Sequence, residues 1–197
     1  MAEPRLWLGI AGPLLLVVHC AAPAVAAEPI LVLHVDDRAG VPPRELAAAK
    51  VVVERTFRAA GVEIGWTESR FPASITATRA GFPPARHLAI MLVNNTEEST
   101  RGAAGCALGF AAPRHSVAYV FYNRIVDASR TRPVDLTVVL GRVIVHEVGH
   151  LLLPPNSHAP YGIMRADLDL GFSNPDRFTD DQARAIRSRV TGGPAGQ

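Results

Sequence analysis

The stretch HEVGHLLLPPNSHAPYGIM, residues 146–164, decides how this chain is interpreted. Its first residues, His146 and His150, belong to the apolar segment 134–153, which is too long and continuous for a strand and is predicted to be a buried helix. Four residues are just over one helical turn, so both imidazoles project from the same face of that helix. Because imidazole nitrogens are good zinc ligands, the spacing predicts two ligands of a zinc site.

Glu147 follows the first histidine and is displaced by about 100° around the helix axis. Its carboxylate is therefore expected beside a metal ion rather than on it, where it can take a proton from water. Three ionisable groups are costly in a helix rich in Val, Leu and Ile unless they have partners, and a metal supplies one. A His-Glu-x-x-His match also arises by chance, so this apolar setting is what favours the metal site.

The stretch resembles the active site of the metzincin zinc metalloproteases, most closely the matrixin-like members. Their motif His-Glu-x-x-His-x-x-Gly-x-x-His is followed by a turn that contains Met. Here HEVGH (146–150) matches the first part, and YGIM (161–164) resembles the Met-turn. The resemblance covers nearly all of residues 28–190: the motifs carry it in 146–164, and the order of strands and helices carries it elsewhere. It implies that Met164 forms an apolar floor under the histidines and is not a ligand.

The third zinc ligand departs from the family pattern. Leu153 stands at the family's glycine position and is followed by two prolines, so the chain must leave the helix differently. Asn156 stands at the third-histidine position, and His158 lies two residues further on. Imidazole is a better zinc ligand than an amide oxygen, so His158 is the expected third ligand. Asn156 stays the alternative.

Other zinc arrangements have weaker support. No glutamate follows Glu147, which excludes the usual gluzincin arrangement. Asp167 and Asp169 lack the Gly-Thr-x-x-Asp setting of aspzincins and are expected to be loop carboxylates in water. Three other histidines are scattered and lack ligand spacing: His34, His87 and His115. Tyr161 stands between the expected third ligand and the Met-turn, where a tyrosine can stabilise an oxyanion, but a structural role is expected.

The N-terminal residues 1–27 are typical of a secretory signal peptide, because Arg5 precedes an apolar run and small residues follow around Ala26. The run is too short to span a bilayer comfortably, so we expect a secreted or periplasmic protein without a stable membrane anchor after cleavage. Cleavage would leave Cys106 as the single cysteine, and no internal disulfide is expected. The net charge of +2 is too small to indicate a nucleic-acid partner.

Residues 28–197 are expected to form one α+β catalytic domain. Apolar runs predict five strands, at 30–37, 62–68, 87–94, 105–111 and 116–123. Helical periodicity and end signals predict three helices, at 42–61, 134–153 and 178–190. This order predicts a twisted mixed sheet of about five strands with a helix packed behind it, the active-site helix beneath its open side and a C-terminal helix. The resemblance implies a metzincin-like fold.

We therefore expect a secreted zinc-dependent endopeptidase that hydrolyses peptide bonds, with Glu147 as general base on a zinc-bound water. One catalytic zinc ion would be held by His146, His150 and His158. The resemblance implies that a peptide or protein substrate pairs in extended form with an edge strand near residues 106–110. A monomer is expected. The alternative is a non-catalytic secreted zinc-containing binding or structural domain, against which the presence of Glu147 argues.

Overall fold

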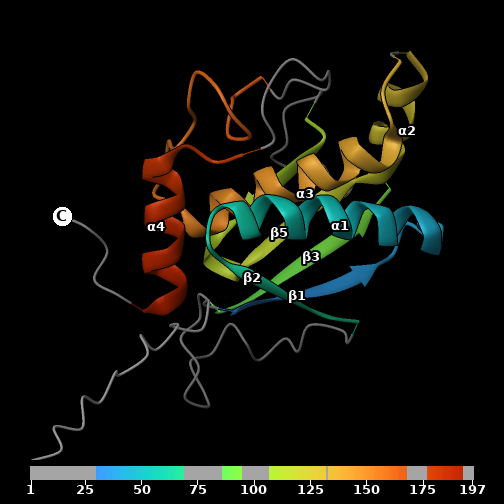
Figure 1. The fold of residues 1–197 in the computed structure, drawn as a ribbon. Helices are drawn as coiled ribbons and strands as arrows, with labels where there is room; N and C mark the ends of the chain where they lie inside the picture. Colours follow the sequence, from blue (N-terminus) through green and yellow to red (C-terminus); the bar gives the residue numbers. More distant parts are fainter. Residues whose placement is uncertain (1–29, 69–85, 95–106, 132, 168–176, 193–197) are drawn as a thin grey trace, which may run out of the picture.

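The computed structural model of the chain describes residues 30–68, 86–94, 107–131, 133–167 and 177–192. The predicted signal peptide, Cys106 and Asp169 lie outside these residues. Each predicted strand and helix is present, and one further helix, α2, was not predicted (Figure 1). The elements are β1 (Ile30–Asp37), α1 (Pro43–Ala59), β2 (Glu63–Thr67), β3 (His87–Val93), β4 (Gly109–Ala112), β5 (Val117–Phe121), α2 (Tyr122–Thr131), α3 (Leu136–Leu152) and α4 (Asp180–Thr191).

The five strands form one mixed sheet in the order β2-β1-β3-β5-β4. β1 runs parallel to β2 and β3, β3 runs parallel to β5, and β4 is antiparallel to β5. The predicted α+β class and five-stranded mixed sheet are therefore confirmed. Within the described ranges β4 pairs with β5 alone, which makes it an edge strand of the sheet.

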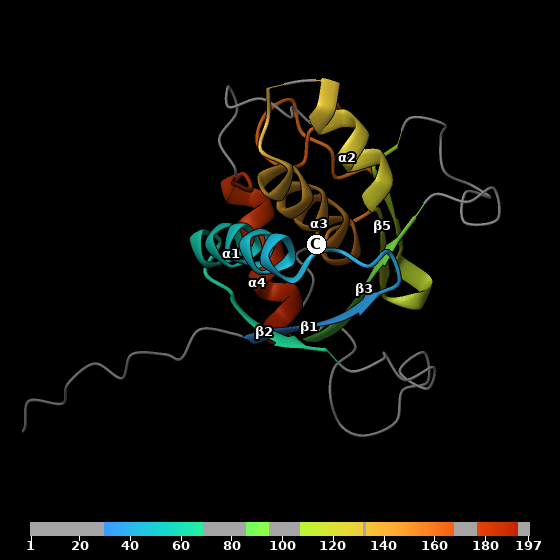
Figure 2. The same ribbon diagram turned by 90° about the vertical axis from the view of Figure 1, so that its right-hand side faces the viewer.

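The helices α1, α3 and α4 all lie inside the curve of the sheet (Figure 2). Alternate strand residues point toward them, and Leu31 and Leu33 of β1 share one buried core with Val53 of α1 and Ile144 of α3. The prediction that one helix lies behind the sheet and the other beneath its open side is therefore wrong. Both helices pack on the same face, because each buries its apolar surface against the sheet and against the other helix.

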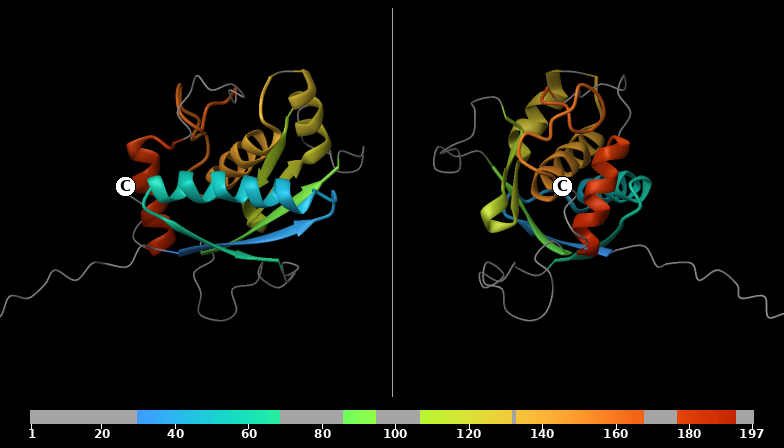
Figure 3. Two further views of the ribbon diagram at one scale, coloured as in Figure 1. Left: turned by 45° about the vertical axis from the view of Figure 1, so that its right-hand side comes forward. Right: turned by 90° about the vertical axis from the view of Figure 1, so that its left-hand side faces the viewer.

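α1 and α3 lie close together at Gly141. A Cβ atom built at Gly141 would lie 2.6 Å from Val52 Cβ and 2.9 Å from the carbonyl oxygen of Ala49. α4 packs at the C-terminal end of α1 (Figure 3), where the rings of Phe57 and Phe178 have centroids 5.2 Å apart. These contacts hold α3 between the sheet and the other helices.

The helix α2 follows β5 directly, so the strand predicted at 116–123 ends at Phe121. Ile125 is the one buried residue of this helix. The apolar residues of the segment do recur at the helical period, a signal that the strand prediction through residue 123 overlooked. Tertiary contacts also hold α2, such as the hydrogen bond of 2.5 Å that the Tyr122 hydroxyl donates to Glu45.

The ends of the other helices follow local signals. α3 begins after Asp135, whose side chain accepts hydrogen bonds from the backbone N–H groups of Thr137 and Val138, and it ends before Pro154. α4 begins after Thr179, whose side chain caps it, and ends at Gly192 in a left-handed conformation. In the part of the chain that the structure describes, none of the helices combines the length and the apolar character that crossing a membrane requires.

Candidate metal centre

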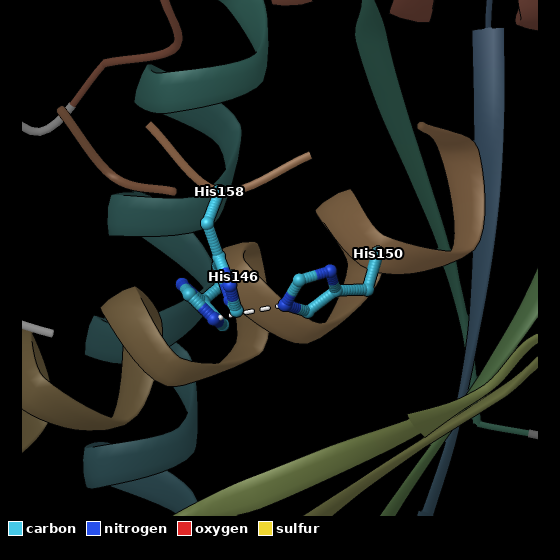
Figure 4. A group of neighbouring side chains, drawn as sticks. All are labelled: His146, His150 and His158. Carbon is cyan, nitrogen blue, oxygen red and sulfur yellow. Dashed lines mark hydrogen bonds between the residues drawn. The ribbon is translucent and has the colours of Figure 1, made fainter. Parts of the chain in front are cut away.

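Three histidines meet near the C-terminal end of α3 (Figure 4). His146 and His150 lie on successive turns of this helix, and His158 reaches them from the segment that follows it. Potential ligand nitrogens of the three rings all lie within 4.8 Å of one another. Among the described residues, no other group of three or more His, Cys, Asp or Glu side chains is close enough to share a metal ion.

The spacing of the rings suits a single ion. The Nε2 atoms of His146 and His150 are 3.1 Å apart. Two nitrogens of a tetrahedral zinc site, each about 2.0 Å from the ion, would be about 3.3 Å apart. The ring centroid of His158 lies 5.5 Å from that of His146 and 4.7 Å from that of His150. Small side-chain rotations would therefore bring three imidazole nitrogens onto one ion.

His146 is oriented by the segment that precedes the buried Met164. Its Nδ1 atom lies 2.9 Å from the carbonyl oxygen of Ile163, and a carbonyl oxygen can only accept, so Nδ1 carries the proton. In the neutral ring this leaves Nε2 unprotonated and directed at the other histidines. A hydrogen bond to the second ring nitrogen is the usual support of a metal-binding histidine.

The burial of the two helical histidines favours the metal-binding form. Burial, together with the nearby His146 and His158, lowers the pKa of His150 to about 4. Burial also lowers the pKa of His146, although its hydrogen bond to Ile163 acts in the opposite direction. Both rings are therefore neutral near pH 7, as metal binding requires.

Glu147 lies on the buried side of α3, directed at the edge strand. It is 7% exposed, and burial raises the pKa of its carboxyl group to about 8. A Cβ atom built at Gly109 in β4 would lie 2.9 Å from Glu147 Cγ and 3.1 Å from Oε1. The glycine thus leaves the space that the glutamate side chain occupies, beside the edge strand.

Met164 packs beneath the helix at Gly149. Met164 is fully buried, and a Cβ atom at Gly149 would collide with its Sδ atom. Any larger residue at position 149 would therefore displace the methionine. This contact places Met164 as an apolar support under the turn of α3 that carries His150.

The chain leaves α3 by a route that the prolines impose. Leu153 is extended, with φ −94° and ψ 160°, where the family pattern would have a glycine. The left-handed residue is instead Asn156, with φ 62°, a conformation that Asn adopts more readily than most residues. Asn156 is exposed in this turn, and His158, two residues later, carries the imidazole that joins the cluster.

The other predicted candidates lie apart from this cluster or outside the described residues. Asp167 is exposed and is not part of the group. His115 lies in a short 3-10 turn after β4, and Tyr161 is 60% exposed. His34 and His87, expected to be scattered, meet across the parallel strands β1 and β3, with Nε2 of His34 3.0 Å from Nδ1 of His87.

Two contacts of the site were missed by sequence reasoning. One is the approach of Gly109 to Glu147, which joins β4 to α3. The other is a hydrogen bond of 2.9 Å from Gln182 Nε2 to the carbonyl oxygen of Ser157, the residue before His158. The sequence signal for the second contact is Gln182 itself, which stands three residues after Thr179, the spacing of a capping box.

No protein-family model and no curated protein matches the chain. A crystal structure of a zinc-dependent peptidase from Methanocorpusculum labreanum is similar at 15% sequence identity and a TM-score of 0.46, over 81% of this chain and 99% of that chain. This similarity is too distant to carry an argument about function, which therefore depends on the histidine cluster and Glu147.

Proposed function

We propose that this protein is an exported zinc-dependent endopeptidase whose metal is held by His146, His150 and His158. The observation that carries the proposal is the meeting of three imidazoles beside a buried glutamate that follows the first of them. Export is proposed from the signal-peptide character of residues 1–27.

The residues suit a catalytic zinc ion better than a structural one. Structural zinc sites are usually closed by four protein ligands, whereas catalytic sites use three and keep one position open. Three ligand candidates cluster here among the described residues, and His158 is exposed, so the cluster can be reached from solvent. A zinc ion at this site would polarise the scissile carbonyl group and lower the pKa of water.

Glu147 is proposed as the general base and then the general acid of the hydrolysis. Its carboxylate would take the proton of the attacking water and then give it to the nitrogen of the leaving amine. Burial raises the pKa of Glu147 to about 8 in the metal-free protein. A zinc ion beside the carboxyl group would lower that pKa and so favour the ionised form that accepts the proton. The imidazole of His146 would keep its orientation throughout, because Ile163 holds Nδ1.

The edge strand β4 is proposed as the place where the substrate backbone binds. β4 lies beside Glu147, and an extended peptide can add to an exposed sheet edge by backbone hydrogen bonds. Backbone pairing would present a peptide bond to the glutamate without demanding particular side chains. The proposed substrate class is therefore an unfolded or extended peptide segment.

A peptide-library assay on zinc-loaded protein tests this function. We expect about one zinc per chain, cleavage of peptides, loss of cleavage with a chelator and recovery when zinc is returned. Folded protein that cannot take up zinc would contradict the metal site. Zinc-loaded protein that cleaves no peptide would favour the alternative, a secreted zinc-containing binding or structural domain.

A further inference from the structure

The side chain of Gln182, in the first turn of α4, is hydrogen-bonded both to the cap of its own helix and to Ser157 in a distant segment. Thr179 and Gln182 form a capping box, in which the Thr179 backbone N–H donates to Gln182 Oε1 at 3.0 Å and the Gln182 backbone N–H donates to Thr179 Oγ1 at 3.3 Å. The side-chain nitrogen of the same glutamine donates to the carbonyl oxygen of Ser157 at 2.9 Å. Gln182 is 9% exposed, so these bonds are largely shielded from water.

Capping alone does not account for an amide at this position. A capping box needs only an acceptor at the third residue of the helix, and glutamate serves as well as glutamine. The amide nitrogen is an additional donor, and it is used on a segment 25 residues earlier in the chain. The amide nitrogen of Gln182 therefore makes a hydrogen bond that capping does not require, to a residue outside its own helix.

The oxygen that accepts this bond belongs to the peptide group that joins Ser157 to His158. Because a peptide group is planar, fixing its carbonyl oxygen also fixes the direction in which the chain enters His158. The His158 side chain is exposed and gains little orientation from packing. Its backbone is held on both sides: Gln182 bonds the Ser157 carbonyl oxygen, and the Ala159 backbone N–H donates to the carbonyl oxygen of Met164 at 2.9 Å. The Gln182 bond is thus one of two backbone tethers that can aim the exposed imidazole at His146 and His150.

The same end of α4 also supports the first histidine. The backbone N–H of Ile163 donates to the carbonyl oxygen of Arg177 at 2.9 Å, just before α4. The carbonyl oxygen of Ile163 in turn accepts from His146 Nδ1. Residues 177–182 therefore connect through hydrogen bonds to both His146 and the peptide group of His158.

We propose that Gln182 is a positioning residue for the third metal ligand, acting on His158 through the Ser157 carbonyl. This inference rests on the proposed zinc site. It assigns α4 a role in metal retention that is separate from its contribution to the core.

Gln182→Glu separates the two tasks of this side chain. The carboxylate can still accept from Thr179, but it cannot donate to Ser157. We expect zinc affinity in a competition titration to fall ten- to a hundredfold, as for other losses of outer support around a metal site. With cobalt in place of zinc, the visible absorption of the tetrahedral site should weaken or shift.

Thr179→Ala is the matched control. It removes the acceptor for the Gln182 backbone but keeps both side-chain bonds of the glutamine. We expect a lower melting temperature of the metal-free protein with zinc affinity within about twofold of the original. Should Gln182→Glu not fold, Gln182→Met, which removes both bonds at similar volume, is compared with Thr179→Ala in the same way.

A double-mutant cycle identifies the route of the effect. If Gln182 acts through His158, then Gln182→Glu should have no further effect on zinc affinity in a His158→Ala background. Unchanged affinity in Gln182→Glu, equal losses in Gln182→Glu and Thr179→Ala, or additive losses in the cycle would overturn the inference. If the original protein itself takes up no zinc, the proposed function fails. That result differs from the three above, which overturn the inference about Gln182 while the original protein still binds zinc.

Discussion

His146 Nδ1 lies 2.9 Å from the carbonyl oxygen of Ile163, and the backbone N–H of Ile163 is bonded to the carbonyl oxygen of Arg177. The peptide groups on either side of Ile163 thus link α3 to the residues just before α4. Gly162, just before them, has φ 81°, a left-handed conformation that disfavours residues with a Cβ atom. The orientation of a proposed ligand therefore depends on a glycine that lies outside the His-Glu-x-x-His motif.

Gly162→Ala is expected to disturb both stability and zinc binding. The new Cβ atom would lie 2.7 Å from the carbonyl oxygen of Arg177, so the Ile163 peptide must shift and His146 loses its support. We expect a loss of stability of about 1–2 kcal/mol from backbone strain and at least tenfold weaker zinc binding. Gly40→Ala is the control, since φ is 71° and no atom lies within 4 Å of its Cβ. For Gly40→Ala, denaturant unfolding should show a similar loss of stability, and zinc titration should show unchanged affinity. Equal zinc affinities in the two variants would contradict the link from Gly162 through Ile163 to His146.

His158→Ala and Asn156→Ala should separate the two candidates for the third ligand. Removing a direct ligand should weaken zinc binding by more than the roughly hundredfold that outer residues account for. Asn156→Ala should cost about 1 kcal/mol of stability through its left-handed backbone and affect zinc only mildly. Asn156→Gly, which tolerates this conformation, should recover the stability. Collapse of zinc affinity in Asn156→Ala, with near-original affinity in His158→Ala, would reverse the assignment.

Glu147→Gln should separate catalysis from metal binding. The amide keeps the shape of the side chain but cannot act as a base, so zinc content should be retained while hydrolysis falls on the order of a thousandfold. Metal analysis and peptide cleavage on the same preparation check both expectations. Cleavage that survives this change largely intact would show that another group takes the proton.

The same substitution should reveal the buried carboxyl group in the pH dependence of stability. The pKa of Glu147 is raised from 4.5 to about 8 in the folded state, so the unfolded chain releases its proton first. Its contribution to stability is fully present below pH 4.5 and is lost as pH rises toward 8. In metal-free protein, the stability of Glu147→Gln relative to the original should therefore increase across this window by several kcal/mol, at about 1.4 kcal/mol per pKa unit.

This difference isolates the glutamate because the histidines are present in both proteins. The lowered pKa of His150 destabilises both alike as pH falls through 6.5 toward 4. Equilibrium unfolding of chelator-treated samples at several pH values provides the measurement. A difference between the two proteins that does not change with pH would show that Glu147 is ionised normally in the folded protein.

Gly109→Ala is expected to reduce activity through the edge strand. Its Cβ atom would lie 2.6 Å from the carbonyl oxygen of Tyr119 and 2.9 Å from Glu147 Cγ, so either β4 or the glutamate must move. We expect at least tenfold lower kcat/KM, retained zinc and a loss of about 1–3 kcal/mol of stability. Gly65→Ala is the control, because its Cβ would meet only methyl groups at 3.6 Å. Activity that is equal in the two variants would separate Gly109 from the site.

Much of the secondary structure could be predicted because its causes are local. The helical period alone places His146 and His150 on one face of α3, with Glu147 beside them. The Pro154–Pro155 pair ends that helix, and Thr179 begins α4, because caps and prolines act within a few residues. The strands follow from short apolar runs, and they form the mixed sheet that their order predicted.

Other features depend on which elements pack together, and no local pattern records that. The position of α2 depends on contacts such as Tyr122 with Glu45, 77 residues apart, although its own sequence is amphipathic at the helical period. The helices α1 and α3 lie on one face of the sheet because they bury surface against each other as well as against the strands. The order of the strands and helices in the sequence did not predict that both helices lie on the same face.

The candidate metal centre combines both kinds of information. The sequence by itself determined that two imidazoles share a helix face, and ligand chemistry favoured His158 over Asn156 as their companion. Only the tertiary structure decided how the chain turns at Asn156, which peptide group Gln182 holds, and how Gly109 makes room for Glu147. The physical reason is that helix geometry sets the positions of residues four apart, whereas the position of a loop residue relative to a helix is set by every element that packs between them.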